Sequence, residues 1–598
     1  MKTKSNLFQI CLLGAVLLAL PCAVQAQFTF TTNNGAITVT GYTGTNSTVV
    51  IPNMTNGYPV TGIGTNAFFR RPVSSVTIPD SITNIGDYAF ANCIWLTNIL
   101  IGTNIASVGA SAFYSCGFLP SIVLGNKVAN IGDSTFYRCQ ALTNVIIGNS
   151  VTNIGASAFY GCSSLANLSI GGNFISIGNS AFLGCTKLTN FTMPDSVTNI
   201  GSSAFQGCTN VATIAIGTNV IGIGSQAFYN CSRLASITIP VGVTSIGSYV
   251  FSGCTSLSSV SIPNGVTTIG IYAFNSCSKL PSIAIPYTVT NISGSAFSGC
   301  SGLGAINVDP ANPVYSSVDG VLFNNSKTSI ILCPLAKTGS YSVPYGVTRI
   351  GDNTFASCKL TRVIIPNSVT NIGNTVFQYC GNLTNITIPS SVVSMGGGVF
   401  FGCLNLTSIT IPNSVTSWGG GVFQNCTALT NVTLLNGIPG IGGNQFYNCQ
   451  SLASIVIPAS VTSIGDQAFA WCTSLNSIYF QGNAPTNNGG YIFFNANINL
   501  VIYYLPGTTG WDVPFDGLQT VLWNPQEQTN DGSFGVQSNQ FGFNITGTTN
   551  IPIVVEACTN LASAWVALQS LNLTNGLVYF SDPQWINYPG RFYRIRSP

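Results

Sequence analysis

Cysteine is the residue whose chemistry stands out first, because sixteen of the 20 cysteines recur in two runs with spacings of 22 or 23 residues. If each period forms one coil of a stack, equivalent β-carbons lie about 4.8 Å apart on parallel bonds, whereas a disulfide prefers about 3.8 Å. Cysteine also packs well as a small buried apolar residue. We therefore predict a column of structural thiols rather than disulfides or a metal site, comprising Cys93, Cys116, Cys139, Cys162, Cys185, Cys208, Cys231, Cys254, Cys277, Cys300, Cys358, Cys380, Cys403, Cys426, Cys449 and Cys472.

Catalytic combinations are scarce, because the chain has no histidine. This excludes Ser-His and Cys-His pairs and any metal held by imidazole. Ser276 and Lys279 spell an S-x-x-K motif, but Lys279 occupies the same repeat position as Lys187 and Arg233, which indicates a solvated loop. We expect these residues to provide neither enzymatic activity nor a cofactor site.

Paired carboxylates are the remaining route to hydrolysis, as in glycosidases. The chain has only 14 acidic residues, and the nearby pairs are Asp309 with Asp319 and Asp512 with Asp516. Nothing in the surrounding sequence marks these pairs as buried. A carbohydrate-processing enzyme is therefore the least favoured of three hypotheses for function.

The cysteine period belongs to a larger repeat, which dominates the chain. Counting from each cysteine, apolar residues stand near +3, +6, +8, +12 and +15, with Gly at +16, Phe at +20 and often Pro at +9. The Phe position recurs seventeen times, from Phe68 to Phe469. A fixed period of this length is typical of a solenoid, in which each coil is stabilised by its neighbours. We predict a mainly β solenoid of about seventeen coils.

Each repeat position has a predicted structural role. Residues +6 and +8 are two apart, so both point inward from a short strand while +5 and +7 point outward. The Gly at +16 is often followed by a residue that caps helices, which predicts one short helical turn presenting Ala and Phe to the core. These residues are Asp87, Asp133, Asn179, Ser202, Asp352 and Asp466.

The first 26 residues have the features of a secretory signal peptide, with Lys2 and Lys4, an apolar segment and a cleavage site after Ala26. Removing the two lysines leaves 15 basic (17 − 2) and 14 acidic residues, a net charge of +1. This balance does not favour nucleic acid or an anionic membrane as partner. No transmembrane segment is expected after cleavage, and the protein is predicted to be secreted or at the cell surface.

The remaining chain divides into segments by pattern. Residues 27–60 are predicted to form an N-terminal β cap around an Asn34-Gly35 hairpin, and residues 61–480 the solenoid. An inserted hairpin at about 309–345 contains predicted strands Val321–Asn324 and Ser329–Cys333. Residues 481–525 are predicted to be a C-terminal cap. Residues 526–598 are predicted to be a small β-sandwich-like domain with a hairpin at Asn575-Gly576.

The repeat unit S-V-T-N-I-G-x-x-A-F-x-G-C-x-x-L-T-x-I-x-I-P resembles the BspA-type leucine-rich repeats of bacterial and protozoan surface proteins. It stands almost whole at Ser196–Ile216 and Ser368–Pro389, and Tyr315–Phe323 resembles a hairpin that recurs in that family. The resemblance covers about residues 50–525. It implies a cell-surface adhesin or ligand-binding protein, since known members bind host matrix proteins, but it transfers no fixed binding residues.

The outward strand positions are the leading candidates for a binding face. They form an uncharged array of hydroxyls and amides that turns apolar towards the N-terminus, and exposed apolar area often has a partner. The candidate residues are Leu100, Val123, Ile146, Asn167, Ser169, Asn190, Thr192, Thr213, Ser236, Thr238, Ser259 and Ser261.

Two hypotheses for function are favoured over a carbohydrate-processing enzyme. The first is a scaffold that binds an extracellular protein or polysaccharide through this outward face. The second is a structural component of the envelope or matrix with no specific ligand, in which the face is merely a soluble sheet surface. A competing binding site is the insertion from Asp309 to Tyr345, which carries charges at Asp319, Lys327 and Lys337.

Overall fold

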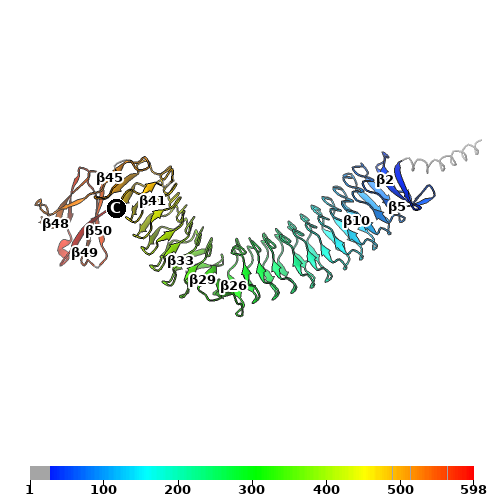
Figure 1. Cartoon of the computed structure of the whole chain (residues 1–598), viewed down its shortest axis with the longest axis horizontal. Coiled ribbons are helices and arrows are strands. Elements are labelled where there is room, and N and C mark those ends of the chain that lie inside the picture. The colour runs from blue at the N-terminus through cyan, green and yellow to red at the C-terminus, as the bar shows by residue number, and fades with distance from the viewer. Residues whose placement is uncertain (1–26, 488, 512–513, 562, 598) are drawn as a thin grey trace, which may run out of the picture. The chain divides into compact units, whose positions relative to one another are not determined.

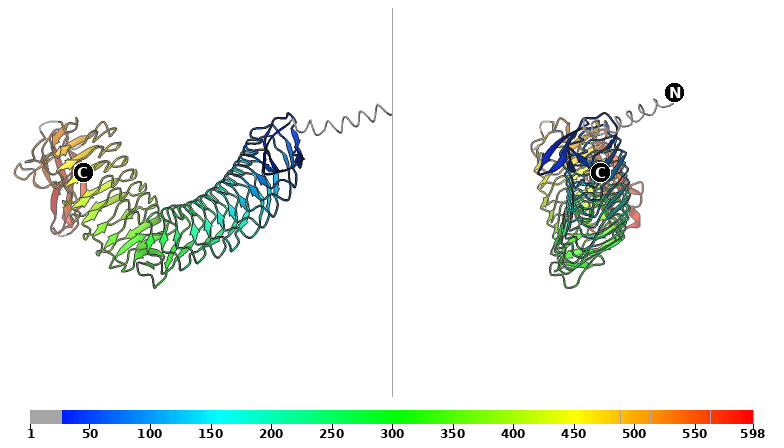
Figure 2. Two further views of the ribbon diagram at one scale, coloured as in Figure 1. Left: turned by 45° about the vertical axis from the view of Figure 1, so that its right-hand side comes forward. Right: turned by 90° about the vertical axis from the view of Figure 1, so that its right-hand side faces the viewer.

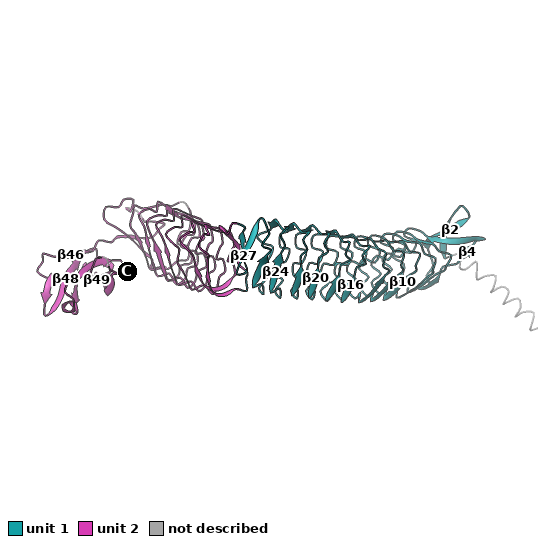
Figure 3. Ribbon diagram, turned by 90° about the horizontal axis from the view of Figure 1, so that it is seen from below, with its two compact units in different colours: residues 1–325, 334–336 teal, residues 326–333, 337–598 magenta. Residues whose placement is uncertain are grey.

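The computed structural model describes residues 27–487, 489–511, 514–561 and 563–597. The predicted signal peptide and Asp512 lie outside the described residues. The chain divides into two compact units (Figure 3). The first unit runs to Asn325 and includes Pro334–Ala336, and the second contains Ser326–Cys333 and Lys337 to the C-terminus. The boundary between the units therefore falls inside the inserted segment.

The first unit is built from coils whose strands pair in parallel with those of the next coil (Figures 1 and 2). The ladder of outward-facing strands comprises β3 (Thr48–Val50), β6 (Ser75–Ile78), β8 (Asn98–Ile101), β10 (Ser121–Leu124), β12 (Asn144–Ile147), β14 (Asn167–Ile170), β16 (Asn190–Thr192), β18 (Thr213–Ala215), β20 (Ser236–Thr238), β22 (Ser259–Ser261), β24 (Ser282–Ile285) and β26 (Ala305–Val308). Most of its +6 and +8 residues are buried, for example Ile122 and Leu124, and the predicted solenoid is confirmed.

A second ladder consists mostly of two-residue strands around the +15 isoleucine. In the first unit it comprises β5 (Tyr58–Ile63), β7 (Asn84–Ile85), β9 (Ser107–Val108), β11 (Asn130–Ile131), β13 (Asn153–Ile154), β15 (Ser176–Ile177), β17 (Asn199–Ile200), β19 (Gly222–Ile223), β21 (Ser245–Ile246), β23 (Thr268–Ile269) and β25 (Asn291–Ile292). It begins at an antiparallel hairpin of β1 (Phe28–Asn33) and β2 (Ala36–Tyr42), with β4 (Met54–Thr55) pairing β5. Asn34 and Gly35 have φ of 50° and 79°, so the predicted hairpin turn is confirmed.

Both ladders continue in the second unit. The outward strands are β30 (Thr338–Ser342), β32 (Lys359–Ile364), β34 (Asn385–Ile386), β36 (Ser408–Ile411), β38 (Asn431–Leu434), β40 (Ser454–Ile457), β42 (Ser477–Phe480), β44 (Val501–Tyr504) and β45 (Thr520–Leu522). The others are β29 (Ser329–Leu332), β31 (Arg349–Ile350), β33 (Asn371–Ile372), β35 (Ser394–Met395), β37 (Ser417–Trp418), β39 (Gly440–Ile441), β41 (Ser463–Ile464) and β43 (Thr486–Asn487). Parallel pairing through β44 and β45 shows that the predicted C-terminal cap continues the outward ladder.

A stack of phenylalanine rings forms the centre of each unit. Neighbouring rings are 4.8 Å apart between Phe68 and Phe90 and 5.7 Å apart between Phe274 and Phe297, and most pairs are nearly parallel. In the second unit the stack extends past Phe469 to Phe493, whose ring centroids are 5.8 Å apart. The rings from Phe68 to Phe469 are buried, since most of them are covered by a ring on each side, whereas Phe493 at the end of the stack is half-buried.

The third side of each coil is not the predicted short helical turn, so that prediction is wrong. Tyr88 and Asn92 have φ of 54° and 59°, and equivalent left-handed residues recur along the chain. Alternate N–H groups therefore point to the next coil: Tyr88 N–H donates to the Ala110 carbonyl at 2.9 Å, and Phe90 N–H donates to the Ala112 carbonyl at 2.7 Å. A helix would turn these donors back into its own coil.

Four of the six predicted capping residues, Asp87, Asp133, Asn179 and Asp352, stabilise this third ladder instead. The Asp87 carboxylate accepts the backbone N–H of Ala110, the equivalent residue of the next coil, at 2.8 Å. Asp133 and Asn179 accept equivalent bonds at 2.7 and 2.8 Å. Among the described residues the helical segment is the 3-10 turn η1 (Trp585–Asn587), and no helix there is long and apolar enough to span a membrane.

The inserted segment forms an antiparallel hairpin of β27 (Tyr315–Val318) and β28 (Val321–Asn324), followed by β29, so both predicted strands are confirmed. The hairpin packs on its own coil, because Ile306 N–H donates to the Gly320 carbonyl at 2.8 Å. The buried Asn312 side chain also anchors the hairpin to the neighbouring coil. Its amide donates to the carbonyls of Pro286 and Val289, both at 2.9 Å.

The C-terminal module has two antiparallel sheets that share one core. One sheet contains β46 (Gln526–Gln528), β47 (Gly535–Gln537), β48 (Gln540–Thr546) and β51 (Leu577–Asp582); the other contains β49 (Pro552–Cys558), β50 (Val566–Asn572) and β52 (Phe592–Arg596). The predicted hairpin at Asn575-Gly576 is wrong, because that turn connects β50 to β51 in the other sheet. The shared core also includes Tyr479 and Tyr503 of the last coils.

Candidate functional site

The outward columns of the first unit are open to solvent. All twelve candidate residues are exposed, including Asn167, Ser169, Asn190, Thr192, Thr213, Ser236, Thr238, Ser259 and Ser261. The parallel register places equivalent residues side by side, as Ser236 pairs with Ser259 and Thr238 with Ser261. The result is a regular, uncharged surface of hydroxyl and amide groups.

The N-terminal part of this face is apolar. Leu100, Val123 and Ile146 are 58%, 56% and 41% exposed, and Val123 lies directly opposite Ile146 in the ladder. Two exposed aromatic residues beside this apolar column, Trp95 and Phe118, were not predicted from the sequence. They lie on the loops that lead into β8 and β10. Their rings are stacked at 6.0 Å and are 57% and 56% exposed. Their shared +2 position was the available signal, because polar or small residues occupy it in most other coils.

The cysteine column has a hydrogen-bonding role. Fifteen of the sixteen thiols donate to the carbonyl of a column phenylalanine in the preceding coil, as Cys208 does to Phe182 at 3.1 Å. The sixteenth, Cys358, donates to the Cys333 carbonyl at 3.5 Å. Burial raises the pKa of the Cys208 thiol to about 12, although the hydrogen bond from Cys185 N–H lowers it in part. The Cys208 thiol is therefore a protonated donor and a poor nucleophile at neutral pH.

We expect thiol counting to reflect this burial. A thiol-reactive dye should label almost none of the column cysteines in the folded protein and most of them in denaturant without reductant. Cys208→Ala should lower the free energy of unfolding by about 1–2 kcal/mol, since it removes a small buried group and one hydrogen bond. Extensive disulfide cross-linking between coils would contradict the structural-thiol assignment.

The possible catalytic residues that the structure describes lie in loops and turns. Lys279 of the S-x-x-K motif is exposed. Asp309 accepts the backbone N–H of Ala311 at 2.8 Å, and Asp319 forms the tip of the hairpin turn with φ of 49°. Among the described residues, no group of three His, Cys, Asp or Glu side chains is placed to hold a metal ion. The positions of Lys279, Asp309 and Asp319 are those of loop and turn residues.

Two adjoining cavities lie on the outward face of the last coils, where the sequence analysis proposed no site. One, of about 330 Å³, is lined by residues of β38 and β40, and the other, of about 190 Å³, lies between β42, β44 and the end of β52. Both are lined by Val456 and Gln481. Val456 and Tyr479 stand at +7, so the bulky residues in this column were the available signal.

Comparison with known proteins gives matches to repeat proteins. A family model described as the BspA type leucine rich repeat region matches residues 61–189, 175–304, 335–438 and 394–508. No curated protein sequence matches the chain significantly.

Solved structures with similarity include three bacterial proteins. A leucine rich cell surface protein from Faecalibacterium prausnitzii is 28% identical, over 76% of this chain and 94% of that one, with a TM-score of 0.40. A leucine-rich repeat protein from Bacteroides ovatus is 22% identical, over 83% and 98%, with a TM-score of 0.34. The pneumococcal vaccine antigen PcpA is 16% identical, over 83% and 97%, with a TM-score of 0.31.

Proposed function

Because the chain belongs to the BspA-type leucine-rich repeat family, we propose that it is a secreted or cell-surface protein that binds an extracellular protein or polysaccharide. The ligand lies on the outward face of the solenoid. The observation that carries this proposal is the exposed apolar group of Trp95, Leu100, Phe118, Val123 and Ile146, which continues into an uncharged polar array. Contiguous exposed apolar surface of this kind marks interaction sites.

Affinity on such a face accumulates over several coils. Each coil offers two outward side chains, and one neutral hydrogen bond contributes only about 0.5–1.5 kcal/mol. A single change such as Thr238→Ala therefore has little effect. The same reasoning makes the face sensitive to added charge, because a lysine on each coil would interrupt the contact along its whole length.

We expect five lysines at the +7 positions 100, 123, 146, 169 and 192, which are all exposed, to abolish binding while the solenoid stays folded. Binding is measured with the mature protein against a panel of polysaccharides and matrix glycoproteins. The matched control places five lysines on the other ladder, at Ile175, Thr198, Ile221, Thr244 and Thr267, which are also exposed. Loss of binding in both variants would indicate a charge effect rather than a binding face.

The inserted hairpin is the competing site, and its test is a set of substitutions rather than a deletion. Deletion would remove the hydrogen bonds of Asn312 and expose its coil. Changing Asp319 and Lys327 to Ser leaves those bonds in place. If these substitutions remove binding and the lysine series does not, the repeat face is a scaffold. Ordered assembly of the purified protein without any ligand would favour a structural role in the envelope or matrix.

A further inference from the structure

The outward ladder of the second unit is interrupted near its end. Strand β38 closes one sheet and β40 opens the next, and the cavity of about 330 Å³ lies on the face of these two strands. Its lining includes Asn431, Thr433, Leu435, Asn436 and Ser454. It adjoins the cavity of about 190 Å³ at Val456 and Gln481, so the two form one groove, here called the terminal groove.

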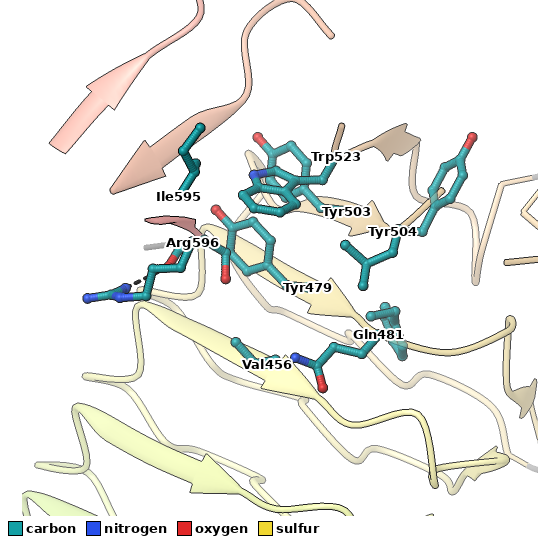
Figure 4. Close-up of a pocket in the computed structure, with 11 residues that line it drawn as sticks. Val456, Tyr479, Gln481, Tyr503, Tyr504, Trp523, Ile595 and Arg596 are labelled. Carbon is teal, nitrogen blue, oxygen red and sulfur yellow. Dashed lines mark hydrogen bonds between the residues drawn. The ribbon is translucent and has the colours of Figure 1, made fainter. Parts of the chain in front are cut away.

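The C-terminal module closes one side of the terminal groove. Figure 4 shows Tyr479 and Tyr503 next to Trp523, with Ile595 and Arg596 on the other side of Tyr479. The two tyrosine rings are stacked at 4.9 Å. Register places Val456, Tyr479 and Tyr503 opposite one another in successive strands. The floor of the groove is therefore the same outward column that is open in the first unit, here bounded by a wall.

The groove is rich in amides. Arg596 is the charged side chain among the described lining residues, and its Nε donates at 2.6 Å to the Glu556 carboxylate, which also pairs with Arg594. The side chains of Asn431, Asn436 and Gln481 each offer two donor hydrogens and an acceptor oxygen. Such a lining matches a ligand that carries many hydroxyl groups, and its one charged side chain is already paired.

We propose that the terminal groove binds a neutral oligosaccharide, whose hydroxyls pair with the exposed amides of Asn431, Asn436 and Gln481. An extended polypeptide fits less well, because the groove floor is the face of a sheet and gives a peptide backbone no strand edge to pair with. The site uses none of the twelve outward residues of the first unit. This proposal can therefore be tested independently of the binding face proposed above.

The test is calorimetric titration of the mature protein with cellohexaose, laminarihexaose and mannohexaose, alongside anionic hexagalacturonate and gelatin. We expect saturable binding of at least one neutral hexasaccharide. Gln481→Ala should weaken it roughly 2- to 12-fold, the value of one hydrogen bond, because this exposed amide lines both cavities. Asn431→Ala should weaken binding, whereas Asn385→Ala, an exposed +5 residue outside the groove, should not.

Several outcomes would overturn the proposal. These are no binding of any neutral hexasaccharide up to millimolar concentration, binding of hexagalacturonate alone, or binding of gelatin alone. Unchanged affinity in both Gln481→Ala and Asn431→Ala would place any sugar elsewhere. The five-lysine series in the first unit separates the two proposals, because it should leave hexasaccharide binding intact.

Discussion

Raising the pH above about 9 is expected to unfold the solenoid steeply, because the buried cysteine column then loses protons on unfolding. Burial raises the pKa to about 12 in seven folded-state thiols, namely Cys93, Cys139, Cys208, Cys254, Cys380, Cys426 and Cys472. In the unfolded chain a thiol has a pKa of about 8.5. The stabilisation is therefore complete below pH about 8.5 and is lost as the pH rises towards 12.

The size of this effect comes from repetition. Each such thiol lowers the free energy of unfolding by about 1.4 kcal/mol per pH unit in that window, so the four in the first unit amount to about 5 kcal/mol per unit. Urea unfolding followed by circular dichroism between pH 7 and 11 measures it. A variant with Cys208→Ala and Cys254→Ala should be less stable at pH 7 and lose less stability with pH. An unfolding midpoint that is constant from pH 8 to 10 would contradict the prediction.

The core of the solenoid could be predicted from the sequence because its contacts repeat with the chain. A residue such as Phe205 meets its equivalents Phe182 and Phe228, so one period defines all of its neighbours. The same holds for the outward residues, whose exposure follows from alternation along a strand. Periodicity thus determines which side chains are buried and which candidate binding residues are exposed.

The third side of the coil could not be predicted in this way. Left-handed backbone conformations are uncommon for residues such as Tyr88 and Arg138, and local propensity therefore disfavours them. They are stabilised by hydrogen bonds to the next coil, as between Arg138 N–H and the Tyr160 carbonyl at 2.7 Å. An Asp after glycine can either cap a helix or accept a hydrogen bond from the next coil, and the local sequence does not distinguish these two roles. The predicted helix-capping role of Asp133 is therefore wrong.

The terminal groove was missed for a different reason. Its walls come from residues far apart in sequence, since Tyr479 and Arg596 are brought together by packing of the C-terminal module. The Asn575-Gly576 dipeptide predicts a tight turn but does not specify which strands pair on either side of it. Both features depend on non-local contacts that no period encodes.

Removing residues 526–598 is expected to destabilise the last coils of the solenoid, because the module and these coils share one core. Tyr479 and Tyr503, now 5% and 7% exposed, would lose the cover of Phe543, Ile553 and Val555. We expect faster hydrogen exchange in β42 and β44 and binding of a hydrophobic dye, with β10 and β12 unchanged. The milder Phe543→Ala should cost about 3–5 kcal/mol in the second unit. Unchanged exchange in β42 and β44 after truncation would instead show that the module is an independent appendage, since a shared core cannot lose seven of its nine buried residues without exposing the rest.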